Sequence, residues 1–172
     1  TELDQTWIYD PVPAFSYGFN VYLEYKNFDF TAFFQGVQGV DIISDLKKET
    51  DIWAGLNIGN LNKGHRLLNA WCVDNPSSNI PAVTLSDNNN EKRVSTYWVE
   101  NGSYLKLRTI QLGYNLPQNI VSKLSMQRLR MYVSAQNLFT IKSSSFTGVD
   151  PENPNYGYPI PLNITFGLNV TF

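Results

Sequence analysis

The sequence of 172 residues lacks several features that mark common classes of protein. It has no run of about eighteen apolar residues, which excludes a membrane-spanning helix. Its single cysteine, Cys72, excludes an internal disulfide, and together with the single histidine, His65, it does not make up a conventional zinc site. The formal net charge of -2 excludes a basic nucleic-acid binder, and an aromatic content of 14% excludes a disordered tail. We recognise no carboxylate pair, nucleophile triad or glycine-rich phosphate loop, so we expect no catalytic residues, no metal and no cofactor.

What the sequence does contain is alternation of apolar and polar residues, most clearly at its end. One face of an extended strand over residues 164–172 would carry Ile164, Phe166, Leu168, Val170 and Phe172. The last residues of a soluble protein are usually polar and frayed. A transmembrane barrel strand instead presents apolar residues to lipid and polar residues to the lumen over about ten residues. The terminus therefore predicts the closing strand of a transmembrane β-barrel.

Two strands near the start of the chain are predicted to form a hairpin. Ser16 to Tyr25 alternates with aromatic and aliphatic residues on one face, and Phe28 to about Val37 does the same. The two residues between them, Lys26-Asn27, are a candidate for a tight turn. We expect both strands to lie in the barrel wall.

Two later strands complete the predicted set of five. In the third, from about Tyr104 to Leu116, the apolar residues change parity, which predicts a bulge or a rim crossing near Arg108-Thr109. The fourth runs from Arg128 to Thr140. An arginine facing lipid at mid-depth is costly, so Arg130 is expected to face inward.

The connections alternate in length, which predicts their side of the membrane. They have two residues, roughly sixty, about ten and about twenty, as expected when short turns are periplasmic and long loops are extracellular. We expect one extracellular loop over residues 37–95, with short helical pieces such as Ile42 to Thr50, a second over 141–161, and the closing strand over 162–172. The short connection from Gln118 to Gln127 is expected to hold a helical turn.

Five strands do not close a membrane barrel, for which eight is the practical minimum. The chain begins at Thr1 without a signal-like apolar stretch. We therefore expect an all-β, C-terminal segment of a longer protein, a fragment or a processed product that is not stable alone.

Several motifs resemble the C-terminal part of the SusC/RagA family of TonB-dependent outer-membrane transporters of the Bacteroidetes group. In the last eighty or so residues they appear in the family's order, and the segments at residues 15–20 and 33–36 also fit, whereas residues 41–92 match least. The motifs lie at residues 98–117, 129–140, 148–152, 157–159 and 165–172. In addition, the spacing of four C-terminal residues resembles the signal that the barrel-assembly machinery recognises. They are Thr165, Gly167, Val170 and Phe172.

The resemblance implies a barrel of 22 strands in the cell outer membrane, surrounded by outer-membrane lipid and filled by a plug domain. Such proteins import oligosaccharides or peptides, with a SusD-like surface lipoprotein as a lid and the inner-membrane TonB complex as the source of energy. This chain departs from the family pattern because the segment that contacts TonB, the plug and most strands are absent from it. It is not expected to transport alone, to act as an enzyme or to bind nucleic acid.

Aromatic residues in the predicted loops are the candidates for substrate binding, because an aromatic ring offers an apolar surface to a sugar. They are Trp53, Trp71, Tyr156 and Tyr158, and Trp98 belongs to the same group. The alternative, which the residues favour, is an aromatic girdle or loop packing. Asp150 and Glu152 are explained better by turn chemistry than by calcium binding, and His65 is explained better as a solvated loop residue than as a base.

Two other functions remain open on the sequence. A soluble β-sandwich that binds carbohydrate would also have alternating strands and tryptophan-bearing loops. Its strands are usually shorter than the five predicted here. The other is a different outer-membrane barrel, such as a porin or an adhesin, from which only an upstream plug would distinguish an importer.

Overall fold

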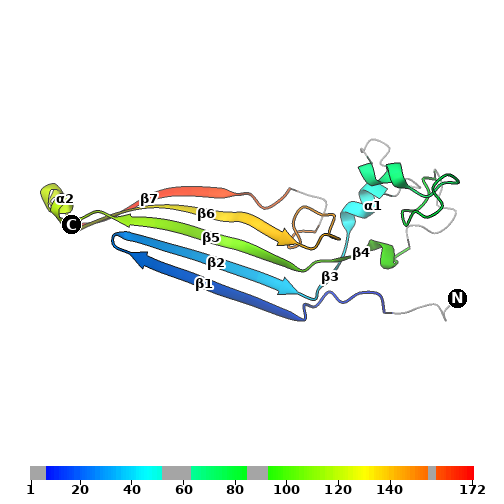
Figure 1. Ribbon diagram of the computed structural model, residues 1–172, viewed down its shortest axis with the longest axis horizontal. Helices are drawn as coiled ribbons and strands as arrows, with labels where there is room; N and C mark the ends of the chain where they lie inside the picture. The colour runs from blue at the N-terminus through cyan, green and yellow to red at the C-terminus, as the bar shows by residue number, and fades with distance from the viewer. Residues whose placement is uncertain (1–6, 52–62, 85–92, 155–157) are drawn as a thin grey trace.

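The computed structural model describes residues 7–51, 63–84, 93–154 and 158–172. Five long strands form one antiparallel sheet in the order β1-β2-β5-β6-β7, so that each pairs with the next long strand along the chain (Figure 1). The prediction of five antiparallel strands is confirmed. Their bounds are β1 Phe15–Tyr25, β2 Phe28–Gln38, β5 Tyr104–Asn115, β6 Arg128–Lys142 and β7 Asn163–Thr171.

The first two strands form the predicted tight hairpin. Their register runs from Phe15 opposite Gln38 to Tyr25 opposite Phe28 without a shift. Only Lys26 and Asn27 lie between them, and Lys26 takes a left-handed φ of 55°. A left-handed residue lets a two-residue turn match the twist of the flanking strands, so the hairpin is closed by backbone geometry alone.

The predicted bulge lies at Arg108. The register of β5 shifts between Leu107 and Thr109 against β6, and the pairing of β2 with β5 shifts at the same level. At that level β6 contains Asn137, whose φ is 56°. The extra residue in β5 changes its parity, so that Leu107 on one side of the bulge and Ile110 on the other reach the same face of the sheet.

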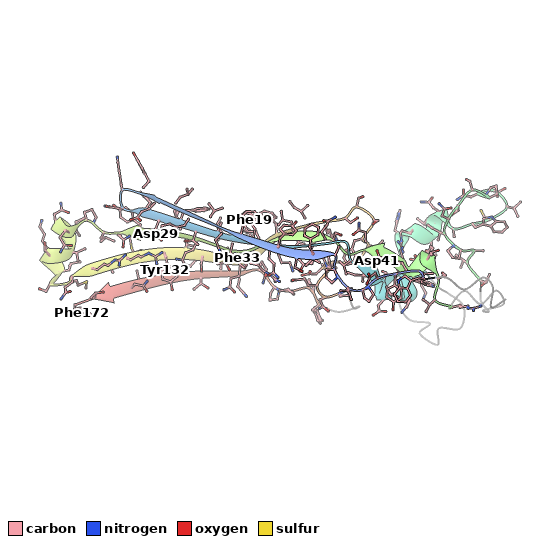
Figure 2. The ribbon with its side chains drawn as sticks, turned by 90° about the horizontal axis from the view of Figure 1, so that it is seen from below. Phe19, Asp29, Phe33, Asp41, Tyr132 and Phe172 are labelled. Atoms are coloured by element: carbon pink, nitrogen blue, oxygen red, sulfur yellow. The ribbon has the colours of Figure 1, made fainter. Side chains whose placement is uncertain are left out.

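Because of this register, one face of the sheet is mainly apolar, and the other carries most of the polar side chains together with a few apolar ones such as Phe33. The apolar face carries aromatic and aliphatic residues from all five strands, with Phe19 stacked on Phe34 at a ring distance of 4.6 Å. Many of these side chains are exposed, up to 81% for Phe166. Within the described residues, neither a second sheet nor a helix covers this face (Figure 2). The polar face carries the alternate residues, including Asn20, Thr31, Thr109, Gln111, Arg130, Ser134 and Thr165.

The two ends of the sheet differ (Figure 1). The end with the hairpin turn, here the turn end, also holds the C-terminus and the short helices α2, Gln118–Val121, and η4, Ser122–Leu124. They form the helical turn predicted for this connection, with Val121 buried. None of the helices in the described residues is long and apolar enough to cross a membrane.

The opposite end, here the loop end, holds a small folded unit. Its two-stranded sheet pairs β3, Asp41–Ile43, with β4, Val99–Asn101, and its helices are α1, Asp45–Asp51, η2, His65–Asn69, and η3, Thr96–Trp98. Trp98 is buried with Ile43 and Tyr97 packed against it. The helix expected from Ile42 to Thr50 is therefore partly wrong, because β-branched Ile42 and Ile43 pair with β4 and the helix begins at Asp45.

Candidate functional site

Near the turn end, the polar face holds a paired arginine and aspartate. The Nε of Arg130 on β6 donates to the carboxylate of Asp29 on β2 at 2.9 Å, and its Nη2 donates to the other carboxylate oxygen. Both side chains are largely buried, at 13% and 12% exposed. The prediction that Arg130 faces the polar side is thus confirmed, and its charge is balanced across the intervening strand.

Two glycines make room for side chains on this face. The Arg130 and Asp29 pair lies directly over Gly113, where any Cβ would overlap it. The ring of Tyr132 lies over Gly167 of β7 in the same way, and the guanidinium of Arg130 sits 5.2 Å from the centre of that ring. The glycines therefore fix how the charged and aromatic side chains cover the sheet.

At the loop end, a buried lysine of the polar face anchors the second long connection. Lys106 is 1% exposed, and its ammonium group donates to the carboxylate of Asp150 at 2.8 and 3.0 Å and to Glu152 at 2.6 Å. Glu152 also accepts from the hydroxyl of Tyr104 at 2.6 Å and from Arg108. We call this group the loop anchor; it holds the segment around Pro151 against the sheet.

The ionisation of Glu152 follows from these contacts. Burial alone would raise the pKa of the Glu152 carboxyl, but hydrogen bonds from Lys106 and Tyr104 and the charge of Arg108 outweigh it and hold the pKa below its usual range. The sequence left Asp150 and Glu152 as turn residues or calcium ligands. In the structure both carboxylates form ion pairs with Lys106. Within the described residues, no cluster of His, Cys, Asp and Glu has the arrangement of a metal site.

A second buried carboxylate joins the two long connections. Glu100 of β4 is 3% exposed; it forms an ion pair with Lys47 of α1 at 3.0 Å and accepts from the backbone N–H and hydroxyl of Thr147 at 3.0 and 2.7 Å. Ser44 and Thr147 also share a hydrogen bond of 3.3 Å. The segment 143–154 is thus bonded both to the sheet and to the folded unit at the loop end.

The folded unit has an ionic centre of its own. The Asp51 side chain is fully buried and accepts from the Tyr97 hydroxyl at 2.6 Å and from Arg66. Burial raises the pKa of Tyr97, and the hydrogen bond to Asp51 raises it further, so the phenol stays protonated as a donor. This contact connects η2 and η3 to α1.

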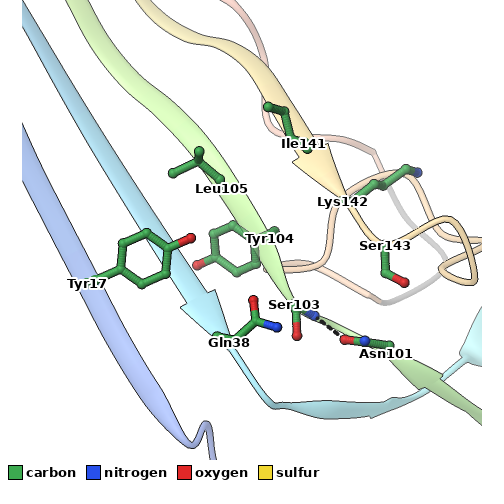
Figure 3. A pocket seen from close by; sticks show the side chains of 9 residues that line it. All are labelled: Tyr17, Gln38, Asn101, Ser103, Tyr104, Leu105, Ile141, Lys142 and Ser143. Carbon is green, nitrogen blue, oxygen red and sulfur yellow. Dashed lines mark hydrogen bonds between the residues drawn. The ribbon is translucent and has the colours of Figure 1, made fainter.

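Among the cavities in the described part of the loop end, two border the sheet, on opposite sides of it. One, of about 370 Å³, is bordered by Tyr17, Leu105 and Ile141, which belong to the apolar face, and by polar residues at the strand ends (Figure 3). The other, of about 600 Å³, lies over Val37 and Tyr104 of the polar face and reaches the loop anchor at Glu152. Only the second faces the same side as the polar residues of the sheet.

Of the four predicted aromatic residues, the structure describes Trp71 and Tyr158, which lie in different connections. Trp71 is 45% exposed in the connection between β3 and β4, and its backbone N–H donates to Ile80 at 2.9 Å. Tyr158 is 95% exposed in the other long connection. Trp53 and Tyr156 lie outside the described residues. Trp98, by contrast, is a core residue of the folded unit at 1% exposed.

The residues of the expected assembly signal lie on or beside β7. Thr165 and Gly167 are on the polar face, opposite Ser134 and Tyr132, whereas Val170 is on the apolar face opposite Leu129. Phe172 follows the strand and is 78% exposed. The residues of the expected signal thus lie on both faces of the strand.

Sequence reasoning missed the loop anchor and the Glu100 contacts. The signal available for the first was a lysine and an arginine, Lys106 and Arg108, in a strand that also carries the parity change. Partners 44 and 46 residues away in the chain were not identifiable from local spacing. The Arg130 position was predicted, but its partner Asp29 was not.

Comparison with known proteins identifies the family of this chain. The chain matches no protein-family model. It is 36% identical to TonB-dependent receptor P3 of Formosa agariphila over 98% of the chain, and 32% identical to receptor P26 of the same organism over 94%. It is also 27% identical to TonB-dependent receptor SusC of Bacteroides thetaiotaomicron over 87% of the chain. The chain spans 17% of the length of P3 and of P26.

Solved structures agree with these relatives. The RagAB peptide importer in its open-open state superimposes with a TM-score of 0.78 and 27% sequence identity, covering 95% of this chain and 18% of the other. A structure of the RagAB peptide transporter gives a TM-score of 0.73 with 28% identity over 90% of this chain. The fold is thus that of a piece of a TonB-dependent β-barrel transporter. On sequence and fold together, the chain belongs to the SusC/RagA family of TonB-dependent receptors.

Proposed function

We propose that this chain is the C-terminal segment of an outer-membrane barrel whose whole protein imports oligosaccharides or peptides by a TonB-dependent mechanism. The observation that carries the proposal is the division of one sheet into an apolar and a polar face. Exposed rings such as Phe19 and Phe166 stand on one face, and Asp29 with Arg130 stands on the other. The apolar face contacts lipid, and the polar face lines the aqueous lumen.

The arrangement of connections supports an orientation. Both short connections lie at the turn end, as does the C-terminus, and both long connections lie at the loop end (Figure 1). Outer-membrane barrels have short periplasmic turns and long extracellular loops. We therefore assign the turn end to the periplasm, and residues 37–95 and 141–161 to the extracellular side.

The edges of the sheet support a role within a larger barrel. The sheet ends at β1 on one side and β7 on the other, and within the described residues neither edge has a further partner. Unpaired backbone groups are not tolerated in hydrocarbon. In the whole protein, β7 pairs with the first strand of the barrel, and β1 pairs with the strand before it. Thr165, Gly167, Val170 and Phe172 serve as the signal for the barrel-assembly machinery.

The partners follow from the family. We propose that the extracellular loops contact a SusD-like surface lipoprotein, and that the TonB complex acts on a part of the protein beyond this chain. The similarity to SusC and to the RagAB importer supports this assignment. Trp53, Trp71, Tyr156 and Tyr158 are our candidates for loop contacts with substrate.

The alternative of a soluble carbohydrate-binding sandwich has less support. A sandwich needs a second sheet on the apolar face. Among the described residues the other sheet contains only β3 and β4 and lies beyond the loop end (Figure 1). The large apolar face is explained more simply by lipid.

The proposal is tested by fractionating the membranes of the native organism and detecting the parent polypeptide with an antibody against residues 143–154. We expect a species several times heavier than the 19.6 kDa of this chain, in the outer membrane and co-purifying with a surface lipoprotein. Deletion of its gene should abolish growth on one class of oligosaccharide or peptide. A soluble species of 19.6 kDa would contradict the proposal and favour the soluble carbohydrate-binding sandwich.

A further inference from the structure

The cavity of about 600 Å³ on the polar side of the loop end has walls from four separate parts of the chain. Tyr9 and Pro11 come from the segment before β1, Val37 and Tyr104 come from the ends of β2 and β5, and Pro151 comes from the anchored loop. The segment before β1 is itself held by hydrogen bonds between Asp10 and Asp41 at 2.9 and 3.2 Å. The cavity is therefore bordered by fixed elements; it is a depression open to solvent, and its volume lies in the range of small-molecule sites.

The lining is apolar and rich in rings. Aliphatic side chains and the rings of tyrosine and proline make up most of it. The aliphatic residues are Val37, Val40, Ile42 and Ile43. The ring-bearing residues are Tyr9, Pro11, Tyr104, Pro151 and Pro154.

Glu152 and the Tyr104 hydroxyl, two of the polar groups at this cavity, are already engaged. Glu152 accepts from Lys106 and Arg108, and the Tyr104 hydroxyl donates to the same carboxylate. Asp41 is half-buried at the opposite side and accepts one backbone N–H through a single oxygen. A polyhydroxyl ligand needs several available hydrogen-bond partners, whereas an apolar group needs none. The remaining charge at the cavity is negative, which disfavours an anionic group.

We propose that this cavity is a subsite for an aliphatic or aromatic side chain of an oligopeptide substrate. The inference rests on the proposed function, because the cavity lies at the extracellular mouth of the lumen only in that orientation. The peptide backbone lies across the mouth, and one uncharged apolar side chain enters between Tyr9 and Pro151. Lys106 is a positioning residue for this subsite, since it holds the loop that carries Pro151 and Glu152.

The test uses the purified whole protein and three probes: pentaglycine, the same peptide with a central leucine, and the same peptide with a central aspartate. Burying one leucine side chain predicts that the leucine peptide binds at least about tenfold more tightly than pentaglycine. The aspartate peptide should bind no more tightly than pentaglycine. Maltohexaose, as a sugar probe, should not compete with the leucine peptide.

Two variants locate the effect. Val40→Trp fills the cavity with a larger side chain, and Tyr9→Ser removes the ring that forms one of its walls. Each should reduce the preference for leucine to less than about threefold. Leu124→Trp is the matched control, because Leu124 is 51% exposed on η4 at the turn end, the opposite end of the sheet. It should keep the full preference.

The outcomes separate this inference from the proposed function. Equal binding of all three peptides, or a leucine preference that survives both cavity variants, would overturn the subsite. So would competition by maltohexaose that is lost in Val40→Trp, because the cavity would then take a sugar. If the cells import neither peptides nor oligosaccharides through the protein, the proposed function fails; if they import either one with unchanged kinetics in both variants, only the subsite fails.

Discussion

Replacing Lys106 by methionine should release the anchored loop. Lys106 is 1% exposed, and Asp150, at 10%, has no other salt-bridge partner within the described residues. Glu152 keeps Arg108 and Tyr104, so the cost comes mainly from Asp150. Removing one member of a buried pair costs roughly 3 kcal/mol, and the loop-opening equilibrium should rise by about a hundredfold.

Hydrogen exchange in the whole protein measures this change. The backbone N–H groups of Ser143 and Thr147 bond outside the connection, to Ser103 and Glu100 at 3.3 and 3.0 Å, so their exchange reports opening of the loop. Lys48→Met is the matched control, because its ion pair with Asp45 is exposed and should contribute little. Adding Asp150→Asn and Glu152→Gln to Lys106→Met should restore much of the protection. Unchanged exchange at these two amides in Lys106→Met would refute the reasoning.

Three further predictions concern the same chain in its full-length protein. The lowered pKa of Glu152 stabilises the loop above the unfolded carboxyl value of about 4.3, and this contribution is lost as pH falls through the lower folded value; Glu152→Gln should abolish that acid sensitivity of loop exchange. Gly167→Val should displace the Tyr132 ring and cost about 1–2 kcal/mol in urea unfolding, and Tyr132→Ala in the same protein should recover part of it; additive effects would contradict the contact. Phe172→Ala should lower the amount of assembled barrel in the outer membrane without altering substrate choice, and normal assembly with changed specificity would disprove that role.

The strands of the sheet were predictable because their information is local. Alternation over about ten residues fixes a strand and its faces, and a change of parity fixes a bulge, as at Arg108. The hairpin turn at Lys26 followed from the distance between two alternating runs. The face on which Arg130 lies was also predicted, because an arginine that faces lipid at mid-depth would be costly.

The folded unit at the loop end was less predictable because its contacts are distant. Ile42 and Ile43 were assigned to a helix, and only the pairing with Val99 and Glu100 makes them a strand. Trp98 was grouped with the candidate substrate-binding aromatics, with an aromatic girdle or loop packing as the favoured alternative, and it packs at the centre of this unit. The candidate aromatic site was drawn from residue type alone, and residue type does not say whether a ring faces solvent or a core.

The contacts of Glu100 with Thr147 have a consequence for how specificity is transferred between relatives. The two long connections are joined by hydrogen bonds from Thr147 to the buried carboxylate of Glu100, so they form one exchangeable module and not two. A chimera that replaces only residues 143–154 would leave Glu100 without Thr147 and Lys106 without Asp150. Grafting a new substrate preference onto this scaffold therefore requires moving both connections as a matched pair, with Lys106 retained in the strand beneath them.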